Sequence, residues 1–248
     1  MSQRIQDYML ASASRGREVV RAGPFTVTIS AHDPLVFINY AIPAAGADPT
    51  PQDIAALEEA FTSRSRTPRL EYLPGLAPLV EPALVAAGFT VTDRLPLMEC
   101  PPGAEVDQPL PDGIELVTPT TEDEFRAMLA AQHEAFGEPP PSAEHVAKAR
   151  ESDNIHLLAR TTGGEPVGGG AAVAVRDGIS EVAGIAVRPA FERRGVGGAL
   201  TLHLTRAARA AGATLVYLTP AGDAQERVYA RVGYRRTDSV LFLTKETS

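Results

Sequence analysis

Two arginines and three glycines lie close together between residues 193 and 198. The apolar run Ile185-Ala186-Val187 precedes them and a segment with helical periodicity follows, which predicts a strand that turns through a loop of bare backbone into a helix. Glycines leave the amide N–H groups uncovered, and the helix N-terminus adds partial positive charge at the same place. Together with Arg193 and Arg194, these groups predict a binding site for a pyrophosphate.

Other phosphate-binding loops fit this stretch less well. A Walker loop needs Gly-Lys-Ser/Thr, and no lysine lies near these glycines. A dinucleotide fingerprint needs G-x-G-x-x-G directly after a strand, whereas the glycines here occupy positions 195, 197 and 198 behind two arginines. An ordinary glycine-rich helix start is the remaining alternative.

The stretch from Val187 to Leu200 resembles the acetyl-CoA signature of the GNAT acyltransferase superfamily, whose core reads Gln/Arg-x-x-Gly-x-Gly/Ala. Gly195 and Gly197 match this core, while Glu192 departs from it at the Gln/Arg position. The resemblance implies that acetyl-CoA is the cofactor, that coenzyme A is released, and that the pantetheine arm lies where the strand before the loop splays from its neighbour. The cofactor-binding residues that it implies are Ile185, Ala186, Val187, Arg193, Arg194, Gly195, Val196, Gly197, Gly198 and Ala199.

Tyr229 is the candidate general acid. The segment from Arg227 to Tyr234 resembles the family pattern of a Leu-Tyr pair followed by Gly-Phe, in which the tyrosine protonates the coenzyme A sulfur. A phenol with a pKa near ~10 is neutral at pH 7 and can donate a proton. The family often has an asparagine seven residues earlier, where this chain has Gly222. The alternative for Tyr229 is a half-buried packing role.

Glu181 is the candidate general base. It precedes Val187 by six positions on the predicted central strand, where many relatives carry a carboxylate that deprotonates the amine through water. The alternative is a solvent-facing glutamate beside a hairpin. His133 and Glu134 are reserve candidates. Because Cys100 falls at the end of the first half, we expect direct attack in a ternary complex and no cysteine-linked acyl intermediate.

Composition and charge narrow the function classes. The hydrophobic content of 44% supports real cores, no apolar run is long enough to span a bilayer, and the N-terminus lacks a signal-peptide pattern. The single cysteine excludes an internal disulfide framework and suits a reducing cytoplasm. The net charge of −8 argues against nucleic acid as a partner. We expect no metal site, since the histidines lack ligand spacing: His32, His133, His145, His156 and His203.

Charge is distributed unevenly along the second half. Residues 112–154 contain ten Asp/Glu and three Lys/Arg, whereas residues 188–236 contain nine Arg and three Asp/Glu. The basic segment includes the predicted phosphate loop, and the acidic segment lies where the family usually builds the acceptor side. An acidic wall would attract a cationic amine. The alternative is that Glu122, Asp123 and Glu124 favour a helix N-terminus.

The chain contains a repeat. A Pro/Gly-rich linker at 101–113 divides it, and the two sides correspond at an offset of 145 residues without a gap. Thus Leu70-Glu71-Tyr72-Leu73 falls on Leu215-Val216-Tyr217-Leu218, and Gly88-Phe89 falls on Gly233-Tyr234. Opposite the phosphate loop stand two prolines and two aspartates, and opposite Tyr229 stands Leu84. We therefore predict a degenerate GNAT-like half at 1–108 without a cofactor loop, and a catalytic GNAT domain at 109–248.

The second half is predicted to form a complete α/β unit. Strands are predicted at 113–117, 155–160, 168–176, 179–187, 215–218 and 234–244, and helices at 121–136, 142–150, 195–211 and 224–232. Asp177-Gly178 is a hairpin signal, and Val196, Leu200, Leu204 and Ala207 should face the core. The predicted fold class is α/β (α+β), a GNAT fold with a mixed, mostly antiparallel sheet flanked by helices in two duplicated halves.

The function expected from these features is a cytoplasmic, acetyl-CoA-dependent N-acetyltransferase that acts on a small cationic amine. The alternative from another class is a non-catalytic acetyl-CoA sensor or binding module, and a purely structural interaction protein is a third. The acceptor stays open between polyamine-like amines, aminoglycosides, amino acids and protein N-termini. The sequence also leaves open whether the protein is a monomer or a homodimer.

Overall fold

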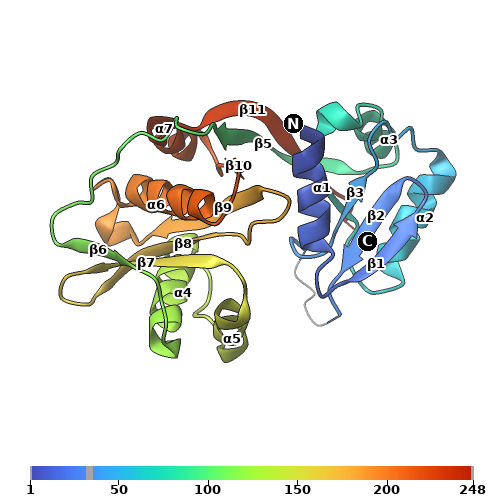
Figure 1. Ribbon diagram of the computed structural model, residues 1–248. Helices are drawn as coiled ribbons and strands as arrows, with labels where there is room; N and C mark the ends of the chain where they lie inside the picture. Colours follow the sequence, from blue (N-terminus) through green and yellow to red (C-terminus); the bar gives the residue numbers. More distant parts are fainter. Residues whose placement is uncertain (1, 32–35, 247–248) are drawn as a thin grey trace. The chain divides into compact units, whose positions relative to one another are not determined.

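The structure, a computed structural model, describes residues 2–31 and 36–246, so His32 lies outside the described residues. The chain forms two compact units (Figure 1). Unit 1 comprises Met1–Leu97 and Thr237–Ser248, and unit 2 comprises Met98–Arg236. Both boundaries fall inside β-strands. The predicted domains, 1–108 and 109–248, are halves of the sequence and differ from these compact units. The domain division at 108/109 stays a prediction.

Unit 1 is a sheet with helices packed on it. Its strands lie in the order β1-β2-β3-β4-β11-β5, and the β3–β4 pair is parallel while β1–β2, β2–β3 and β4–β11 are antiparallel. The elements are α1 (Ser2–Ala13), β1 (Glu18–Ala22), β2 (Phe25–Ile29), β3 (Tyr40–Pro43), α2 (Pro51–Thr62), β4 (Arg69–Tyr72), a short 3-10 helix (Pro74–Leu76), α3 (Val80–Ala86), most of β5 (Thr90–Cys100) and most of β11 (Arg235–Thr244).

Unit 2 is built on the strand order β5-β10-β9-β8-β7-β6, to which β5 contributes its end. The β9–β10 pair is parallel and the other pairs are antiparallel. Helices α4 and α5 cover one face of this sheet and α6 covers the other (Figure 1). The elements are β6 (Ile114–Val117), α4 (Glu122–Phe136), α5 (Ala143–Glu151), β7 (Ile155–Thr161), β8 (Pro166–Ala172), β9 (Ile179–Val187), a 3-10 helix (Pro189–Phe191), α6 (Val196–Ala210), β10 (Leu215–Leu218) and α7 (Asp223–Val232).

This arrangement confirms the predicted fold class, a mixed and mostly antiparallel sheet flanked by helices. Local signals place the helix starts: Thr121 forms a capping box with Glu124 at α4, and Ser142 caps α5 by accepting from the His145 N–H. The β8–β9 connection turns at Asp177-Gly178, whose φ angles of 49° and 72° suit a type I′ turn.

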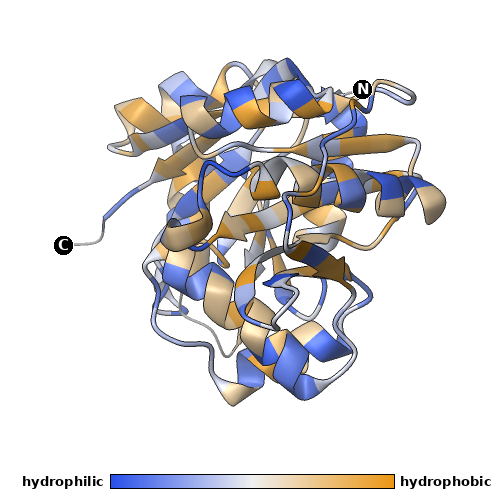
Figure 2. Ribbon diagram, turned by 90° about the vertical axis from the view of Figure 1, so that its left-hand side faces the viewer, coloured by the Kyte–Doolittle hydropathy of each residue, from blue (hydrophilic) through white to orange (hydrophobic). Residues whose placement is uncertain are grey.

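The core of unit 2 lies between α6 and the sheet. Val196, Leu200 and Leu204 are 1% exposed or less, as the helical periodicity predicts. Ala208 is fully buried whereas Ala207 is half-buried, so the buried stripe of α6 runs one position away from the prediction at this turn. Figure 2 shows the same division, with hydrophobic strands and helices that are hydrophobic on one side only. Burial of this stripe fixes the N-terminus of α6 at the end of β9.

The later elements of the two halves match each other: α2, β4, α3 and β5 correspond to α6, β10, α7 and β11. Helix α2 begins at Pro51 and α6 at Val196, 145 positions later; β5 begins at Thr90 and β11 at Arg235, again 145 positions later. The last strand of each half pairs with a strand of the other half. Leu241 of β11 pairs with Tyr72 of β4, and Glu99 of β5 pairs with Tyr217 of β10. The spacing of the repeat therefore corresponds to real elements, while the last strands are exchanged between the halves.

Candidate functional site

Strand β9 has an unpaired edge beside β10. The parallel register joins Leu215 to Ile179, Val216 to Ser180 and Tyr217 to Glu181. Within the described residues, β9 then continues to Val187 with no partner residue on β10. On its other side β9 stays paired with β8, where Arg188 N donates to Val167 O over 2.8 Å. Because N–H directions alternate along a strand, the N–H groups of Ile185 and Val187 face the unpaired edge.

A β-bulge in β9 changes which face its side chains occupy. Val182 belongs to the core on the α6 side, and Ile185 packs against this same core three residues later. A regular strand would put residues three apart on opposite faces, so one extra residue lies between them. The register shift opposite Gly169–Ala171 and the φ of +64° at Gly184 locate that residue. The bulge therefore leaves Glu181 on the α4 face while Ile185 lies on the α6 face.

Gln132 of α4 holds the bulge. Its Nε2 donates to Gly184 O over 2.7 Å, and the side chain is 9% exposed. A Cβ added at Gly184 would lie 2.9 Å from Gln132 Nε2, so a side chain there would displace the amide. Gln132 Oε1 is buried with no hydrogen-bond partner in the described part of the chain. An orphaned buried acceptor costs about 1–3 kcal/mol, and here it accompanies a fixed backbone distortion at the unpaired edge.

The loop after β9 presents the N-terminus of α6. Arg193 and Gly195 both have left-handed φ angles, 59° and 91°, and the value at Arg193 is uncommon for a residue with a side chain. Gly195 is the N-cap of α6 and makes no side-chain capping bond. The N–H groups of the first turn, including those of Val196 and Gly197, are therefore open to a ligand.

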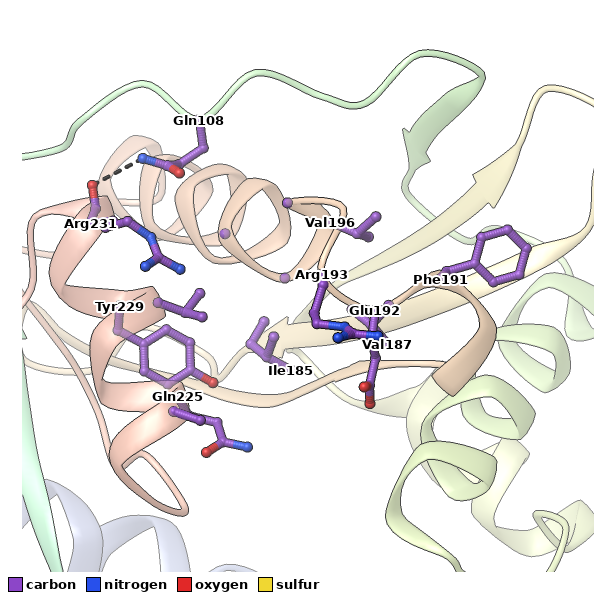
Figure 3. Close-up of a pocket in the computed structure, with 15 residues that line it drawn as sticks. Gln108, Ile185, Val187, Phe191, Glu192, Arg193, Val196, Gln225, Tyr229 and Arg231 are labelled. Atoms are coloured by element: carbon purple, nitrogen blue, oxygen red, sulfur yellow. Dashed lines mark hydrogen bonds between the residues drawn. The ribbon is translucent and has the colours of Figure 1, made fainter.

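These elements surround one cavity of about 540 Å³, shown in Figure 3. The β9 edge contributes Ile185 and Val187, the loop and α6 contribute the backbone groups just described, and α7 supplies the facing wall. The lining residues are Gln108, Ile185, Val187, Phe191, Glu192, Arg193, Gly195, Val196, Gly197, Gly198, Ala224, Gln225, Val228, Tyr229 and Arg231. Most of the residues predicted from the sequence thus lie around one space.

Three predicted contacts do not line the cavity. The side chain of Ala186 is 5% exposed on the opposite face of β9, and Ala199 is fully buried under the first turn of α6. Arg194 turns away: its guanidinium lies 5.2 Å from the Phe191 ring centroid and Nη2 donates to Ala190 O over 3.0 Å. The loop therefore directs only one of its two arginines into the cavity.

Tyr229 reaches the cavity from α7, and in Figure 3 its hydroxyl points toward Ile185 of β9. The ring is 8% exposed and lies against Tyr234, with the centroids 6.4 Å apart. Burial raises the pKa of Tyr229 to about 12. The phenol is therefore protonated throughout the neutral range and can donate a proton.

Glu181 lies where the β9–β10 pairing ends, with its side chain only partly accessible. Tyr217 Oη donates to Glu181 Oε2 over 3.3 Å. Burial raises the pKa of Glu181 to about 7, and the hydrogen bond from Tyr217 opposes part of that rise. A carboxylate with this pKa is both a stronger base than an ordinary glutamate and ionised in a large fraction at neutral pH.

The reserve candidates on α4 are engaged elsewhere. His133 Nδ1 contacts Pro139 O and lies 3.6 Å from Glu138 Oε2, while Glu134 accepts from Arg188 Nε over 2.9 Å. Many other carboxylates of 112–154 are in ion pairs as well: Glu115, Glu122, Glu124, Glu144 and Asp153. These pairs reduce the negative charge that the segment offers to a ligand.

Sequence reasoning missed several lining residues. Gln108 falls in the predicted linker, yet its Nε2 donates to Arg231 O over 3.0 Å and its Oε1 lies 3.2 Å from the place of a Cβ at Gly198. Arg231 enters from the last turn of α7. The basic bias of 188–236 pointed to Arg231, but no local signal connected Gln108, 123 positions away in sequence, with this site.

Comparisons with known proteins agree with this geometry. Residues 122–234 match the acetyltransferase (GNAT) family. A GCN5-related N-acetyltransferase from Kribbella flavida is similar over 100% of this chain and 96% of its own, with a TM-score of 0.86 and 26% identity. A tandem GNAT protein from the clavulanic acid biosynthesis pathway aligns over 93% of this chain and 82% of its own, with a TM-score of 0.64 and 16% identity. None of the curated proteins compared with the chain matches it.

The segment 122–234 is thus similar to the acetyltransferase (GNAT) family, and the fold of the chain matches that of GNAT N-acetyltransferases. These similarities support an acyl-transfer role. Among the described residues no helix is both long and apolar enough to cross a membrane. Nor do they include a cluster of three or more His, Cys, Asp or Glu side chains that could hold a metal ion.

Proposed function

We propose that the protein is an acetyl-CoA-dependent N-acetyltransferase that transfers the acetyl group to an amine by direct attack. The observation that carries this proposal is the single cavity that joins the open N-terminus of α6, the unpaired edge of β9 and the Tyr229 hydroxyl. Coenzyme A carries an anionic pyrophosphate, an extended amide-containing arm and a thiol. Each of these parts has a matching surface in the cavity.

The residues present fit that group. The first-turn N–H groups of α6 and the Arg193 side chain suit the pyrophosphate. The N–H groups of Ile185 and Val187 suit the amides of the arm, as an added strand would. Glu192 brings a carboxylate to the cavity wall, which lowers the expected affinity without blocking the backbone contacts.

When bound, acetyl-CoA supplies an activated acetyl thioester. A β9 N–H at the unpaired edge would donate to the thioester carbonyl oxygen and so stabilise the negative charge that develops there when the amine attacks. Glu181 accepts the proton that the amine nitrogen loses, directly or through water. Tyr229 would donate a proton to the sulfur as the carbon–sulfur bond breaks and would then regain a proton from solvent, while its raised pKa keeps it protonated until that step. The side chains thus bind, orient and move two protons.

The acceptor side is the α4 face of β9, where the bulge leaves Glu181. A cationic amine would be attracted to this carboxylate and would lose its proton to it. The acidic segment 112–154 attracts a cationic amine less strongly than its composition suggests, because many of its carboxylates are paired with arginine or lysine. We therefore base the proposal of a small cationic amine on Glu181 itself.

Two further proposals concern the protein as a whole. The half 1–108 is a degenerate GNAT-like repeat, because α2 and α3 match α6 and α7 in position without the open glycine loop. The cytoplasm is the proposed compartment, since Cys100 is a free thiol whose burial raises its pKa to about 11 and keeps it unreactive.

The deciding experiment is thiol release from acetyl-CoA against a panel of amines, combined with calorimetric titration of coenzyme A. We expect binding together with turnover on at least one cationic amine, and loss of turnover in Tyr229→Phe with binding retained. Binding without turnover on any amine would favour the alternative, a non-catalytic acetyl-CoA sensor. Absence of binding would contradict both functions.

A further inference from the structure

The arginines of unit 2 differ in their partners. Seven form ion pairs with carboxylates: Arg126, Arg150, Arg160, Arg176, Arg188, Arg206 and Arg209. Arg193 and Arg231 line the cavity, and neither forms an ion pair within residues 2–31 and 36–246. Unpaired guanidinium groups in a cavity wall are suited to an anionic ligand.

The two cavity arginines lie on different elements. Arg193 belongs to the loop before α6, beside the proposed pyrophosphate site, whereas Arg231 enters from the last turn of α7 (Figure 3). The N-terminal turn of α6 lies between them in that view. The cavity therefore offers two separate cationic positions to one ligand.

The segment 104–108, which we call the strap, fixes the second position. Val106 N donates to Val232 O over 2.9 Å, and Gln108 Nε2 donates to Arg231 O over 3.0 Å, so the strap holds two consecutive carbonyl groups of the last turn of α7, one of them that of Arg231 itself. Gln108 also packs over Gly198, where an added Cβ would lie 3.2 Å from its Oε1. Gln108 is thus placed as a positioning residue for Arg231.

The acidic residues of the strap do not neutralise Arg231. Asp107 pairs with Arg206 over 2.6 Å, and Glu105 pairs with Arg209 over 3.3 Å. Both arginines belong to α6, so the two carboxylates of the strap are engaged with α6 and do not pair with Arg231. The positive charge of Arg231 therefore stays available at the cavity wall.

We propose that Arg231, positioned by Gln108 and the strap, binds the 3′-phosphate of the coenzyme A moiety. This inference rests on the proposed function and adds a donor specificity to it. Coenzyme A carries two separate anionic groups, a pyrophosphate and a ribose 3′-phosphate, which match the two cationic positions. A guanidinium group binds a phosphate with two parallel N–H donors. The site then selects coenzyme A thioesters over donors that lack the 3′-phosphate, such as dephospho-coenzyme A or carrier-bound phosphopantetheine.

The test is calorimetric titration of the full chain with coenzyme A and with 3′-dephospho-coenzyme A. The wild-type protein should bind coenzyme A about tenfold more tightly, the effect of one charge-assisted phosphate contact of about 1.4 kcal/mol. Arg231→Gln should weaken coenzyme A binding about tenfold and leave dephospho-coenzyme A binding within about twofold. Arg227→Gln, an exposed arginine on the same helix that does not line the cavity, is the matched control and should leave both affinities unchanged.

Two more variants separate positioning from binding. Gln108→Ala should lose part of the preference for coenzyme A in the wild-type background and change nothing in the Arg231→Gln background. Arg193→Gln should weaken both ligands by the same factor, because both carry the pyrophosphate. Equal wild-type affinity for the two ligands, or an equal loss for both in Arg231→Gln, would overturn the proposal. Failure of the proposed function would look different, as neither ligand would bind.

Discussion

Two helix pairs in this protein occupy equivalent positions in the repeat but differ in what they can bind. In unit 2, α6 begins at a glycine without a capping side chain, and Tyr229 of α7 lines the cavity. In unit 1, the N-cap Thr50 and Asp53 of α2 form a capping box, and Pro51 has no N–H to offer. The first-turn donors are open in one unit and occupied by side chains in the other. Helices at equivalent positions of the repeat can therefore differ in phosphate binding, because capping decides whether their first-turn N–H groups are free.

The cavities next to these helices also differ in the charged and polar groups that they offer to a ligand. A cavity of about 450 Å³ lies beside α2 and α3, and its lining is mostly apolar apart from Glu58 and Lys245. Lys245 Nζ donates to Glu58 Oε1 over 2.7 Å and to Ala87 O over 2.9 Å, so its charge is compensated inside unit 1. Leu84, the counterpart of Tyr229, is fully buried. The groove of unit 1 therefore retains the shape of a cleft between two helices without the groups that act on a thioester.

The largest expected effect separates Tyr229 of α7 from Tyr234, which follows that helix. Tyr229→Phe should lower kcat by about 10²–10⁴, the usual worth of a general acid, with coenzyme A affinity unchanged. Tyr234→Phe is the control, because its hydroxyl is bonded to Thr205 Oγ1 over 2.6 Å in the core and should matter to stability alone. Steady-state kinetics with calorimetry measures both. Equal kcat values for Tyr229→Phe and the wild type would leave Tyr229 as a packing residue, like its counterpart Leu84.

A second large effect concerns Glu181, whose counterpart in the repeat is Val36. Turnover should rise with pH through about 7, since the base acts when ionised, and Glu181→Gln should lower the rate and flatten this rise. The raised pKa also means that folding is favoured by the neutral carboxyl, and this contribution disappears as pH rises through about 7. Glu181→Gln should therefore be more stable than the wild type above that pH. A pH profile that the substitution leaves intact would contradict the role of base.

The β9 bulge should show an intermediate effect. Gly184→Ala places a side chain at a left-handed φ, which costs about 1–2 kcal/mol, and its Cβ would meet Gln132 Nε2 at 2.9 Å. If the bulge shifts by about 1 Å, turnover should fall by up to about 10². Gly164→Ala, at φ +92° in an open turn with no atom near the new Cβ, is the matched control for the backbone cost. Denaturation curves measure the backbone strain in each variant, and kcat reports whether the β9 edge has moved. Equal kcat values for Gly184→Ala and Gly164→Ala would contradict a role of the bulge in catalysis.

Ligand-induced stabilisation compares the two helix N-termini directly. At a coenzyme A concentration of about 100 Kd, the wild-type protein should gain about 2.7 kcal/mol, a Tm rise of roughly 5–10 °C. Gly197→Leu should remove this rise, because the new side chain would cover the first-turn N–H groups of α6. The protein should still fold, because the added Cβ would have only Val187 Cγ2 near it, at 3.8 Å. Gln52→Leu, the counterpart on α2, should leave the rise intact. A lost rise in Gln52→Leu would mean that unit 1 also binds the ligand.

The smallest expected effect is in the groove of unit 1. Lys245→Met removes the ion pair with Glu58, and a partly exposed pair of this kind is worth about 0–1 kcal/mol. Coenzyme A affinity should change by less than about twofold, because no cofactor contact is assigned to this groove. Thermal denaturation and calorimetry give the two numbers. A large loss of affinity would show that the two clefts are functionally linked.

The sequence alone determined the features that depend on neighbouring residues. The glycine–arginine loop, the Thr121 capping box, the Asp177-Gly178 turn and most element boundaries follow from local backbone preferences and hydrogen bonds within a few positions. The offset of 145 residues could be seen because equivalent elements repeat the same local pattern. The GNAT fold was predicted from the resemblance of the glycine–arginine loop to the acetyl-CoA signature of that family.

The tertiary structure decided the features that depend on contacts distant in sequence. One extra residue at Gly184 reverses the faces of β9, so that Ile185 lines the cavity and Glu181 does not, and Gln132 holds this bulge from 52 positions away. The linker contributes Gln108 to the site, and each half gives its last strand to the other. A sequence pattern carries no record of these pairings, since their free energy comes from surfaces that meet only in the folded chain.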